Sequence, residues 1–307
     1  MIDATTDTAS PDILALPVVN AANFSGGSCL VCGVVADPVA NQVIFDTGDG
    51  YFVYDVGSNL IVQSFPVLTA ENFGYNPLTR QILSPFYGAP FFSGIFGADL
   101  LDLGTNTSLS FAGSVGSKPD AAAVDYTTNV AIVANEAELV PIGFITLLNL
   151  NAAKIGTNAF SAPSATFQFP DATGFCSGGG NQSEWTMLAV DPANHFLFVS
   201  NEFSDCAGIL DLPPQQSTGI PRTSSQFRFG EMPISPDGLP WSNSGDPHGT
   251  AVFTSVIDGR SYGFLVRSDG HFAGRIDLQN FFNAPVLAGT PGAVDMTTQV
   301  TYLATLP

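Results

Sequence analysis

One sequence pattern recurs along the chain and constrains its fold more than any other feature. The segment from Leu188 to Glu202, LAVDPANHFLFVSNE, has a short apolar run, four turn-forming residues, a second apolar run and a polar end. Weaker copies begin at Val34, Asn72, Ala122 and Ala293. Apolar runs of this length, joined by a tight turn, predict β-hairpins. Hairpins that repeat about every 20–50 residues are typical of a β-propeller.

A third strand is expected after each hairpin, because an acid or amide flanked by apolar residues recurs there. The marker residues are Asp55, Asp102, Asn149, Asp211 and Asp277. Counting the first strands predicts six blades, with five or seven as alternatives. Those strands lie near Val35, Phe73, Val124, Val190, Ala251 and Val294. The fold class predicted is therefore all-β, a single-domain six-bladed propeller.

The domain boundaries follow from where the repeats begin and end. Residues 1–11 are polar and are expected to be flexible, and residues 12–307 form the propeller domain. The apolar run Ile13–Val19 belongs to no complete repeat. We expect it to pair with the C-terminal blade and close the ring, because closure removes exposed sheet edges.

The charge balance excludes two classes of partner. The chain has 27 Asp and Glu against 8 Lys and Arg, a formal net charge of −19. Nucleic acids and anionic membrane surfaces need clustered cations, so neither is expected as a partner. A small molecule, a glycan or a protein remains. Self-repulsion at this charge favours a monomer.

The four cysteines indicate the compartment. Two disulfides are expected, Cys176–Cys206 and Cys29–Cys32, with buried free thiols as the alternative. Disulfides imply an oxidising environment, which predicts a secreted, extracellular or periplasmic protein. The acidic, polar start of this chain shows no signal peptide.

Polar residues at the strand ends predict a shared rim around the central channel. In a propeller, loops that enter the first strand and leave the second lie on one face. They supply Asn135-Glu136 and Asn201-Glu202 from two blades, together with Glu71, Glu184 and His248. Carboxylate and amide oxygens are the ligands of Ca²⁺ or a similar divalent cation. The alternative is that these residues simply end their strands in water.

The A-V-D-P hairpins, the Asp-Leu third strands and the segment Pro247-His248-Gly249 resemble the superfamily of YVTN, NHL and gluconolactonase-like β-propellers. The likeness covers nearly the whole chain and is specific for fold. In the gluconolactonase-like members a Glu, two Asn and an Asp from separate blades hold a divalent cation. The resemblance implies Asn135 and Asn201 as amide ligands and Glu71 or Glu184 as the carboxylate. The Asp has no clear counterpart, and the fifth blade offers His248 instead.

Three functions are consistent with these residues. The first is a secreted, non-catalytic propeller that binds a ligand or partner on its loop face, around a Ca²⁺ ion. The second is a metal-dependent hydrolase of a lactone or ester, in which Glu202 or His248 activates water. The third is a lyase with His248 as base; His195 and His271 are expected at the surface. A hydrolase requires the amide and acid ligands to point into one channel.

Overall fold

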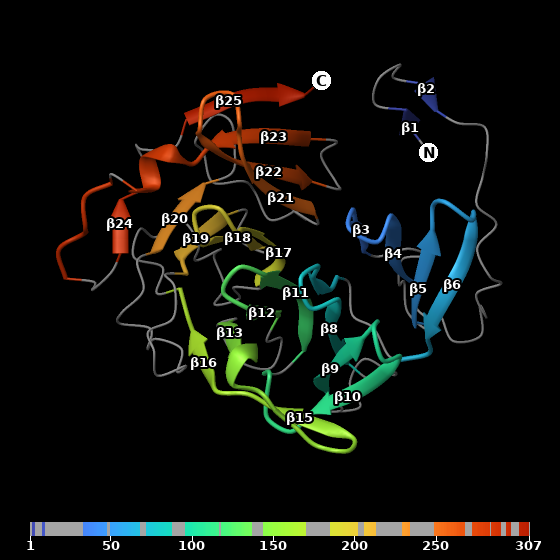
Figure 1. The fold of residues 1–307 in the computed structure, drawn as a ribbon. Coiled ribbons are helices and arrows are strands. Elements are labelled where there is room, and N and C mark those ends of the chain that lie inside the picture. The colour runs from blue at the N-terminus through green and yellow to red at the C-terminus, as the bar shows by residue number, and fades with distance from the viewer. Residues whose placement is uncertain are drawn as a thin grey trace.

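The computed structural model describes 16 stretches of the chain. These are residues 2–3, 8–9, 33–47, 50–67, 72–87, 96–116, 118–136, 144–169, 185–201, 206–212, 229–233, 249–267, 272–282, 284–289, 293–295 and 301–306. They fold as a ring of antiparallel β-sheets, the blades of a propeller (Figure 1). The short strands β1 (Ile2–Asp3) and β2 (Thr8–Ala9) pair only with each other.

The first two blades follow the predicted hairpins. Blade 1 contains β3 (Val34–Asp37), β4 (Gln42–Thr47), β5 (Gly50–Asp55) and β6 (Leu60–Phe65). Blade 2 contains β7 (Gly74–Asn76), β8 (Gln81–Tyr87), β9 (Phe96–Asp102) and β10 (Thr107–Phe111). Two strands from further along the chain, β15 (Ala159–Ser161) and β14 (Lys154–Ile155), extend blade 2 at its outer edge.

The third and fourth blades carry the clearest repeats. Blade 3 contains β11 (Pro119–Asp125), β12 (Val130–Asn135), β13 (Phe144–Asn149) and β16 (Ser164–Phe167), with the 3₁₀ helix η2 (Leu150–Ala152) after β13. Blade 4 contains β17 (Trp185–Asp191), β18 (Phe196–Asn201), β19 (Cys206–Asp211) and β20 (Phe229–Pro233). The predicted marker residues Asp55, Asp102, Asn149, Asp211 and Asp277 each end a third strand.

The described residues form five blades, so the prediction of six is wrong and the alternative of five is confirmed. Blade 5 contains β21 (Gly249–Thr254), β22 (Ser261–Arg267), β23 (Phe272–Asp277) and β25 (Thr301–Leu306), with the 3₁₀ helix η4 (Gln279–Phe282) after β23. The segment expected to open a sixth blade is divided between two others. Its first part, β24 (Ala293–Asp295), runs parallel to β20, and β25 completes blade 5 beside β23. An isolated two-stranded hairpin is marginally stable, so both strands are better placed on existing sheets.

Four hydrophobic clusters lie between successive blades. The cluster between blades 3 and 4 contains Trp185, which is buried against Phe169 with ring centroids 4.3 Å apart. Trp185 is therefore a core residue. Similar clusters join blades 1 and 2, blades 2 and 3, and blades 4 and 5. The segment Ile13–Val19, predicted to close the ring, lies outside the described residues.

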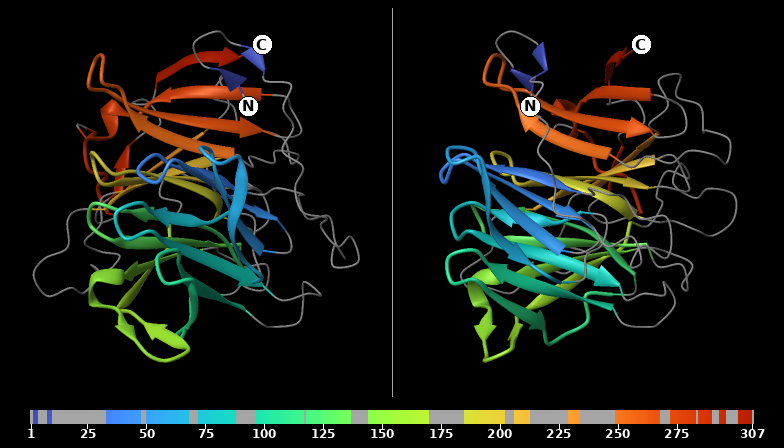
Figure 2. Two further views of the ribbon diagram at one scale, coloured as in Figure 1. Left: turned by 45° about the vertical axis from the view of Figure 1, so that its right-hand side comes forward. Right: turned by 90° about the vertical axis from the view of Figure 1, so that its right-hand side faces the viewer.

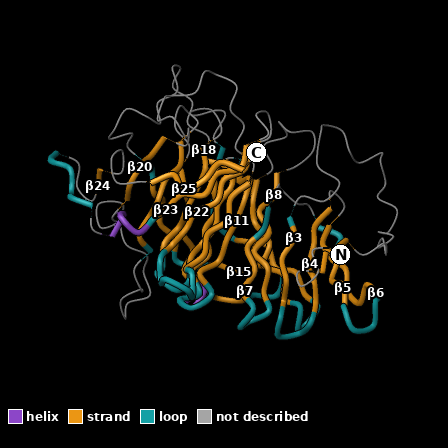
Figure 3. Tube along the Cα trace, turned by 90° about the horizontal axis from the view of Figure 1, so that it is seen from above, coloured by secondary structure: helices purple, strands orange, loops and turns teal. Residues whose placement is uncertain are grey.

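The hairpin turns gather on one side of the ring. They join first to second strands and third to fourth strands, and Figure 3 shows them together below the sheets. Figure 2 shows the same clustering from the side. We call this side the turn face, and the opposite side the loop face. No helix in the described part of the chain is long and apolar enough to cross a membrane.

Candidate functional site

The first strands of all five blades surround a central channel of about 320 Å³. Its wall is made by residues 34–35, 72–75, 122–124, 188–190 and 250–252. A volume of 300–1,000 Å³ or thereabouts is usual for a ligand pocket, so the channel lies at the small end of that range.

The channel wall supplies little acid–base chemistry. Among the described residues that line it there is no carboxylate, imidazole or amine. Tyr75 lines the channel, and its hydroxyl donates to Asp37 Oδ2 at 2.6 Å. Burial, together with this hydrogen bond, raises the pKa of Tyr75, so its phenol stays protonated. The walls are therefore suited to apolar contact rather than to proton transfer.

Asn135 and Asn201 occupy equivalent places, as the sequence pattern predicts. Each is the last residue of a second strand, β12 or β18, and each is fully buried. Neither is part of the channel wall. The Nδ2 of Asn135 points into its own blade and donates to Phe144 O at 3.2 Å and Thr146 Oγ1 at 3.4 Å. In this position Asn135 ties β12 to β13.

Glu136 is held by a cation of the chain itself. Its Oε2 lies 2.8 Å from Lys118 Nζ, and both side chains are largely buried. The Glu136 N–H also donates to Lys118 O at 3.1 Å. The ammonium of Lys118 thus neutralises the carboxylate that was predicted as a metal ligand. A buried pair of this kind is costly to break, because one charge would be left uncompensated.

The described residues do not assemble a divalent-cation site. Among them there is no group of three or more His, Cys, Asp or Glu side chains that could hold a metal ion. The other predicted ligands and catalytic groups lie outside the described residues: Glu71, Glu184, Glu202 and His248. The cation site implied by the gluconolactonase-like resemblance therefore stays a prediction.

The predicted disulfides also fall where the structure gives no description. Cys29, Cys32 and Cys176 lie outside the described residues, and Cys206 is described only as part of strand β19. Both pairings stay predictions.

A polar network on the turn face is the best-defined arrangement in the molecule. Four first strands end in a buried acid or amide: Asp37, Asn76, Asp125 and Asp191. In each, Oδ1 accepts a hydrogen bond from the backbone N–H two residues on, at 2.9–3.1 Å. These are Asx turns, in which a side chain satisfies the turn backbone. The Asp-Pro dipeptides of the repeats are therefore turn-forming residues first.

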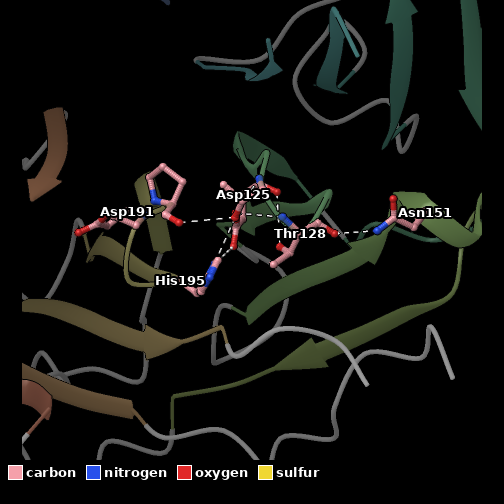
Figure 4. Close-up of polar contacts among 8 residues, drawn as sticks. Asp125, Thr128, Asn151, Asp191 and His195 are labelled. Carbon is pink, nitrogen blue, oxygen red and sulfur yellow. Dashed lines mark hydrogen bonds and ion pairs between the residues drawn. The ribbon is translucent and has the colours of Figure 1, made fainter. Parts of the chain in front are cut away.

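The same side chains also join one blade to the next. The carboxylate of Asp125 in blade 3 accepts from His195 Nδ1 in blade 4 at 2.8 Å (Figure 4). Asn76 Nδ2 in blade 2 donates to Asn129 Oδ1 in blade 3 at 2.7 Å. Asp191 in blade 4 accepts from the hydroxyl of Thr254 in blade 5. These contacts fix neighbouring turns against one another.

Blades 1 and 2 are joined in the same way. Asp37 accepts from Tyr75 and lies 3.5 Å from Arg80 Nε. Burial alone would raise the pKa of Asp37, but the hydroxyl of Tyr75, two turn N–H groups and Arg80 together lower it. Asp37 is thus an ionised structural group at the blade interface.

His195 was expected to be a surface residue, and the structure gives it a structural role instead. Its side chain is 27% exposed and completes the bond to Asp125. Its backbone has φ of 54°, a left-handed conformation shared by Asn41, Arg80 and Asn129 at equivalent turn positions. The recurrence of an acid or amide before each turn was visible in the sequence. The contact between Asp125 and His195 on the next blade was not visible, because the two residues are 70 positions apart in the sequence.

Comparisons with known proteins support the fold. No protein-family model matches this sequence, and a search of curated proteins finds no match. A chain of the nidogen/laminin complex is similar at a TM-score of 0.53 and 10% identity, covering 90% of this chain and 79% of that chain. KlAtg21, in its complex with the coiled coil of AgAtg16, gives 0.52 and 10%, over 90% and 70%. The Cps50 (Swd1) β-propeller domain of Myceliophteria thermophila gives 0.52 and 11%, over 91% and 72%.

These identities are low, so the similarity establishes the fold and nothing finer. The chain is an all-β, single-domain β-propeller. The narrower likeness to YVTN, NHL and gluconolactonase-like propellers stays a prediction.

Proposed function

We propose that this propeller is a non-catalytic binding protein and that its partner is another protein. The observation that carries the proposal is the channel wall, where apolar side chains come from all five blades and the described residues include no carboxylate, imidazole or amine. A hydrolase of the lactonase type needs acid groups that converge in that channel. A rigid ring with an apolar channel and exposed turns is instead suited to contact with a partner surface.

The similar structures agree with this proposal. One is a complex of KlAtg21 with the coiled coil of AgAtg16, and another is a nidogen/laminin complex. The formal charge of −19 supports a protein partner over a nucleic acid or an anionic membrane. Secretion to an oxidising compartment, with the two predicted disulfides, belongs to the same proposal.

The proposal is tested by cross-linking and reconstitution. The protein is incubated in extract of its source, cross-linked, and the linked peptides are identified by mass spectrometry. The candidate partner is then purified and its affinity measured by isothermal titration calorimetry. A one-to-one complex of the two purified proteins is expected. The proposal would be wrong if the purified proteins formed no complex and the protein hydrolysed a lactone or ester in a metal-dependent way.

One observation favours a second candidate, the divalent-metal-dependent hydrolase. The Oδ1 of Asn135 is buried and accepts no hydrogen bond from any described residue. An amide oxygen of this kind is a usual Ca²⁺ ligand, and Asn201 lies at the equivalent place in blade 4. We expect Glu71 or Glu184 to supply the carboxylate and Glu202 or His248 to act on water if this candidate is correct.

Metal content distinguishes the two candidates. Protein purified without chelator is analysed by mass spectrometry for bound cations and then unfolded by heat with and without EDTA. The hydrolase requires a near-stoichiometric cation whose removal lowers the melting temperature, since bound ligand stabilises the folded state. Substoichiometric metal and an unchanged melting temperature would eliminate it and leave the binding function.

A further inference from the structure

The tips of the hairpin turns expose large apolar side chains on the turn face. Val39 in blade 1 is 80% exposed and Leu78 in blade 2 is 71% exposed. Val256 and Ile257 in blade 5 are 101% and 94% exposed. Each belongs to the turn between a first and a second strand. We call these four residues the turn-tip ring.

The turn-tip ring is held in place by the polar network beneath it. Asp37 and Arg80 join the turns that carry Val39 and Leu78. On the other side, Asn194 Nδ2 of blade 4 donates to Thr254 Oγ1 of blade 5 at 2.6 Å, directly before the turn with Val256 and Ile257. A preorganised surface loses little conformational entropy when it binds. Large exposed apolar side chains gathered on one face are a feature of interaction surfaces.

Acidic groups accompany the apolar tips on the same face. Asp55 and Asp102 begin the turns between third and fourth strands, and Asp258 lies in the turn of the ring itself. Hydrogen bonds from Ser58 and from Tyr262 lower the pKa of Asp55 and Asp258, respectively, so both carboxylates are ionised at neutral pH.

Two described cations on this face, Arg80 and Arg260, are already paired within the chain. Arg80 lies against Asp37, and the guanidinium of Arg260 pairs with Asp277. The turn face is therefore apolar at its tips and net acidic around them.

We propose that the turn-tip ring binds a basic amphipathic segment of a partner protein. This surface lies on the turn face, opposite the loop face on which the sequence predicts binding. Apolar side chains of that segment would cover Leu78, Val256 and Ile257, and its Lys and Arg would meet the surrounding carboxylates. This inference rests on the proposed binding function and names its surface and partner class. The negative charge of the chain argues against a second copy of the chain and against an anionic membrane as the occupant. A second copy of the chain also carries a charge of −19, and an anionic membrane is repelled in the same way.

The test uses a defined probe. A fluorescein-labelled helical peptide of 18 residues or so, built from Leu on one face and Lys on the other, is titrated with the full chain and followed by anisotropy. Two further peptides replace every Lys by Glu or every Leu by Ser. The tip variant is Leu78→Ser with Ile257→Ser. Its matched control is Ile155→Ser on β14, because Ile155 is also exposed, at 60%, but lies at the outer edge of blade 2.

The Lys–Leu peptide is expected to bind the wild type and the Ile155→Ser control equally. The tip variant should bind about tenfold more weakly, since loss of central apolar contacts is the usual cause of such an effect. Raising the salt should weaken binding, because the surrounding carboxylates are exposed. The Lys–Ser and Glu–Leu peptides should bind weakly or not at all. Circular dichroism of each variant verifies that the blades are intact.

Three results would overturn the inference. The tip variant could bind as tightly as the control, which would show that the attraction is to overall charge alone. The Glu–Leu peptide could bind as well as the Lys–Leu peptide. The unliganded chain could dimerise in sedimentation experiments in a way that the tip variant abolishes, which would identify a second copy as the occupant. The proposed binding function is tested separately. It would still hold if a reconstituted complex formed through another face of the propeller.

Discussion

Replacing His195 by Ala should destabilise the propeller by loosening blade 4 from blade 3. His195 Nδ1 lies 2.8 Å from Asp125 Oδ2, and the Asp125 carboxylate is fully buried. Removing the imidazole leaves one buried carboxylate oxygen without its partner on the next blade. The other oxygen, Oδ1, keeps its bonds from the N–H and hydroxyl of Thr127 and the N–H of Thr128.

The size of the destabilisation follows from the loss of this one hydrogen bond. Loss of one hydrogen bond to a buried charged group costs about 1–3 kcal/mol. The lower half of that range applies, because His195 is 27% exposed and water can reach part of the site. We expect a loss of about 1.5 kcal/mol in the free energy of unfolding. The melting temperature should fall by about 2 °C, because a chain of 307 residues has an unfolding entropy of about 0.6 kcal/mol/K.

The assay is urea and thermal unfolding, followed by circular dichroism and by the fluorescence of the buried Trp185 in the same blade. The matched control is His195→Asn. Asn tolerates the left-handed backbone of this position, with φ of 54°, and Asn129 occupies the equivalent turn. Its amide can donate to Asp125, so the control should unfold within about 0.5 kcal/mol of the wild type. Equal stability of all three proteins, or equal losses for Ala and Asn, would refute the role assigned to the bond.

Two further predictions concern burial and backbone geometry. Burial raises the pKa of Asp99, and the hydroxyl of Ser110, 2.7 Å away, offsets this only in part. The folded state therefore retains the Asp99 proton to a higher pH than the unfolded chain, and stability is lost as pH rises through that window. Asp99→Asn should be more stable than the wild type at pH 7, and the difference should vanish below about pH 4; a constant difference in urea titrations across pH would argue against this. Gly50→Ala should lower the free energy of unfolding by more than about 2 kcal/mol, because φ is +132° and a Cβ would lie 2.1 Å from Phe65 O. Gly259→Asn should be tolerated, because φ is +69° and the space around this residue is open. Equal melting temperatures for these two variants would contradict the backbone argument.

Most of the fold could be predicted from local sequence signals. The hairpins are encoded by apolar runs around a turn, and the acid or amide that ends each third strand lies close to its own hairpin. Those signals placed Asp55, Asp102 and Asn149 at the ends of β5, β9 and β13. The prediction of a sixth blade was wrong because the local sequence of residues 293–306 has the pattern of a hairpin. Their pairing with β20 and β23 is a long-range choice that no local pattern encodes.

The site was less predictable, because side-chain direction depends on neighbours that are distant in sequence. Repeat spacing correctly placed Asn135 and Asn201 at equivalent strand ends. It could not show that Asn135 Nδ2 turns toward Phe144 O and Thr146 within its own blade. Nor could it show that Lys118, one of two lysines in the chain, would pair with Glu136.

Hydroxyl-radical footprinting with mass spectrometry tests the binding face most directly. The wild type is labelled alone and with a saturating amount of the Lys–Leu peptide, and the modification of each exposed apolar side chain is compared. We predict lower labelling of Leu78, Val256 and Ile257 in the complex, with Ile155 unchanged. Unchanged labelling of the three tip residues, with protection elsewhere on the molecule, would contradict a binding surface on the turn face.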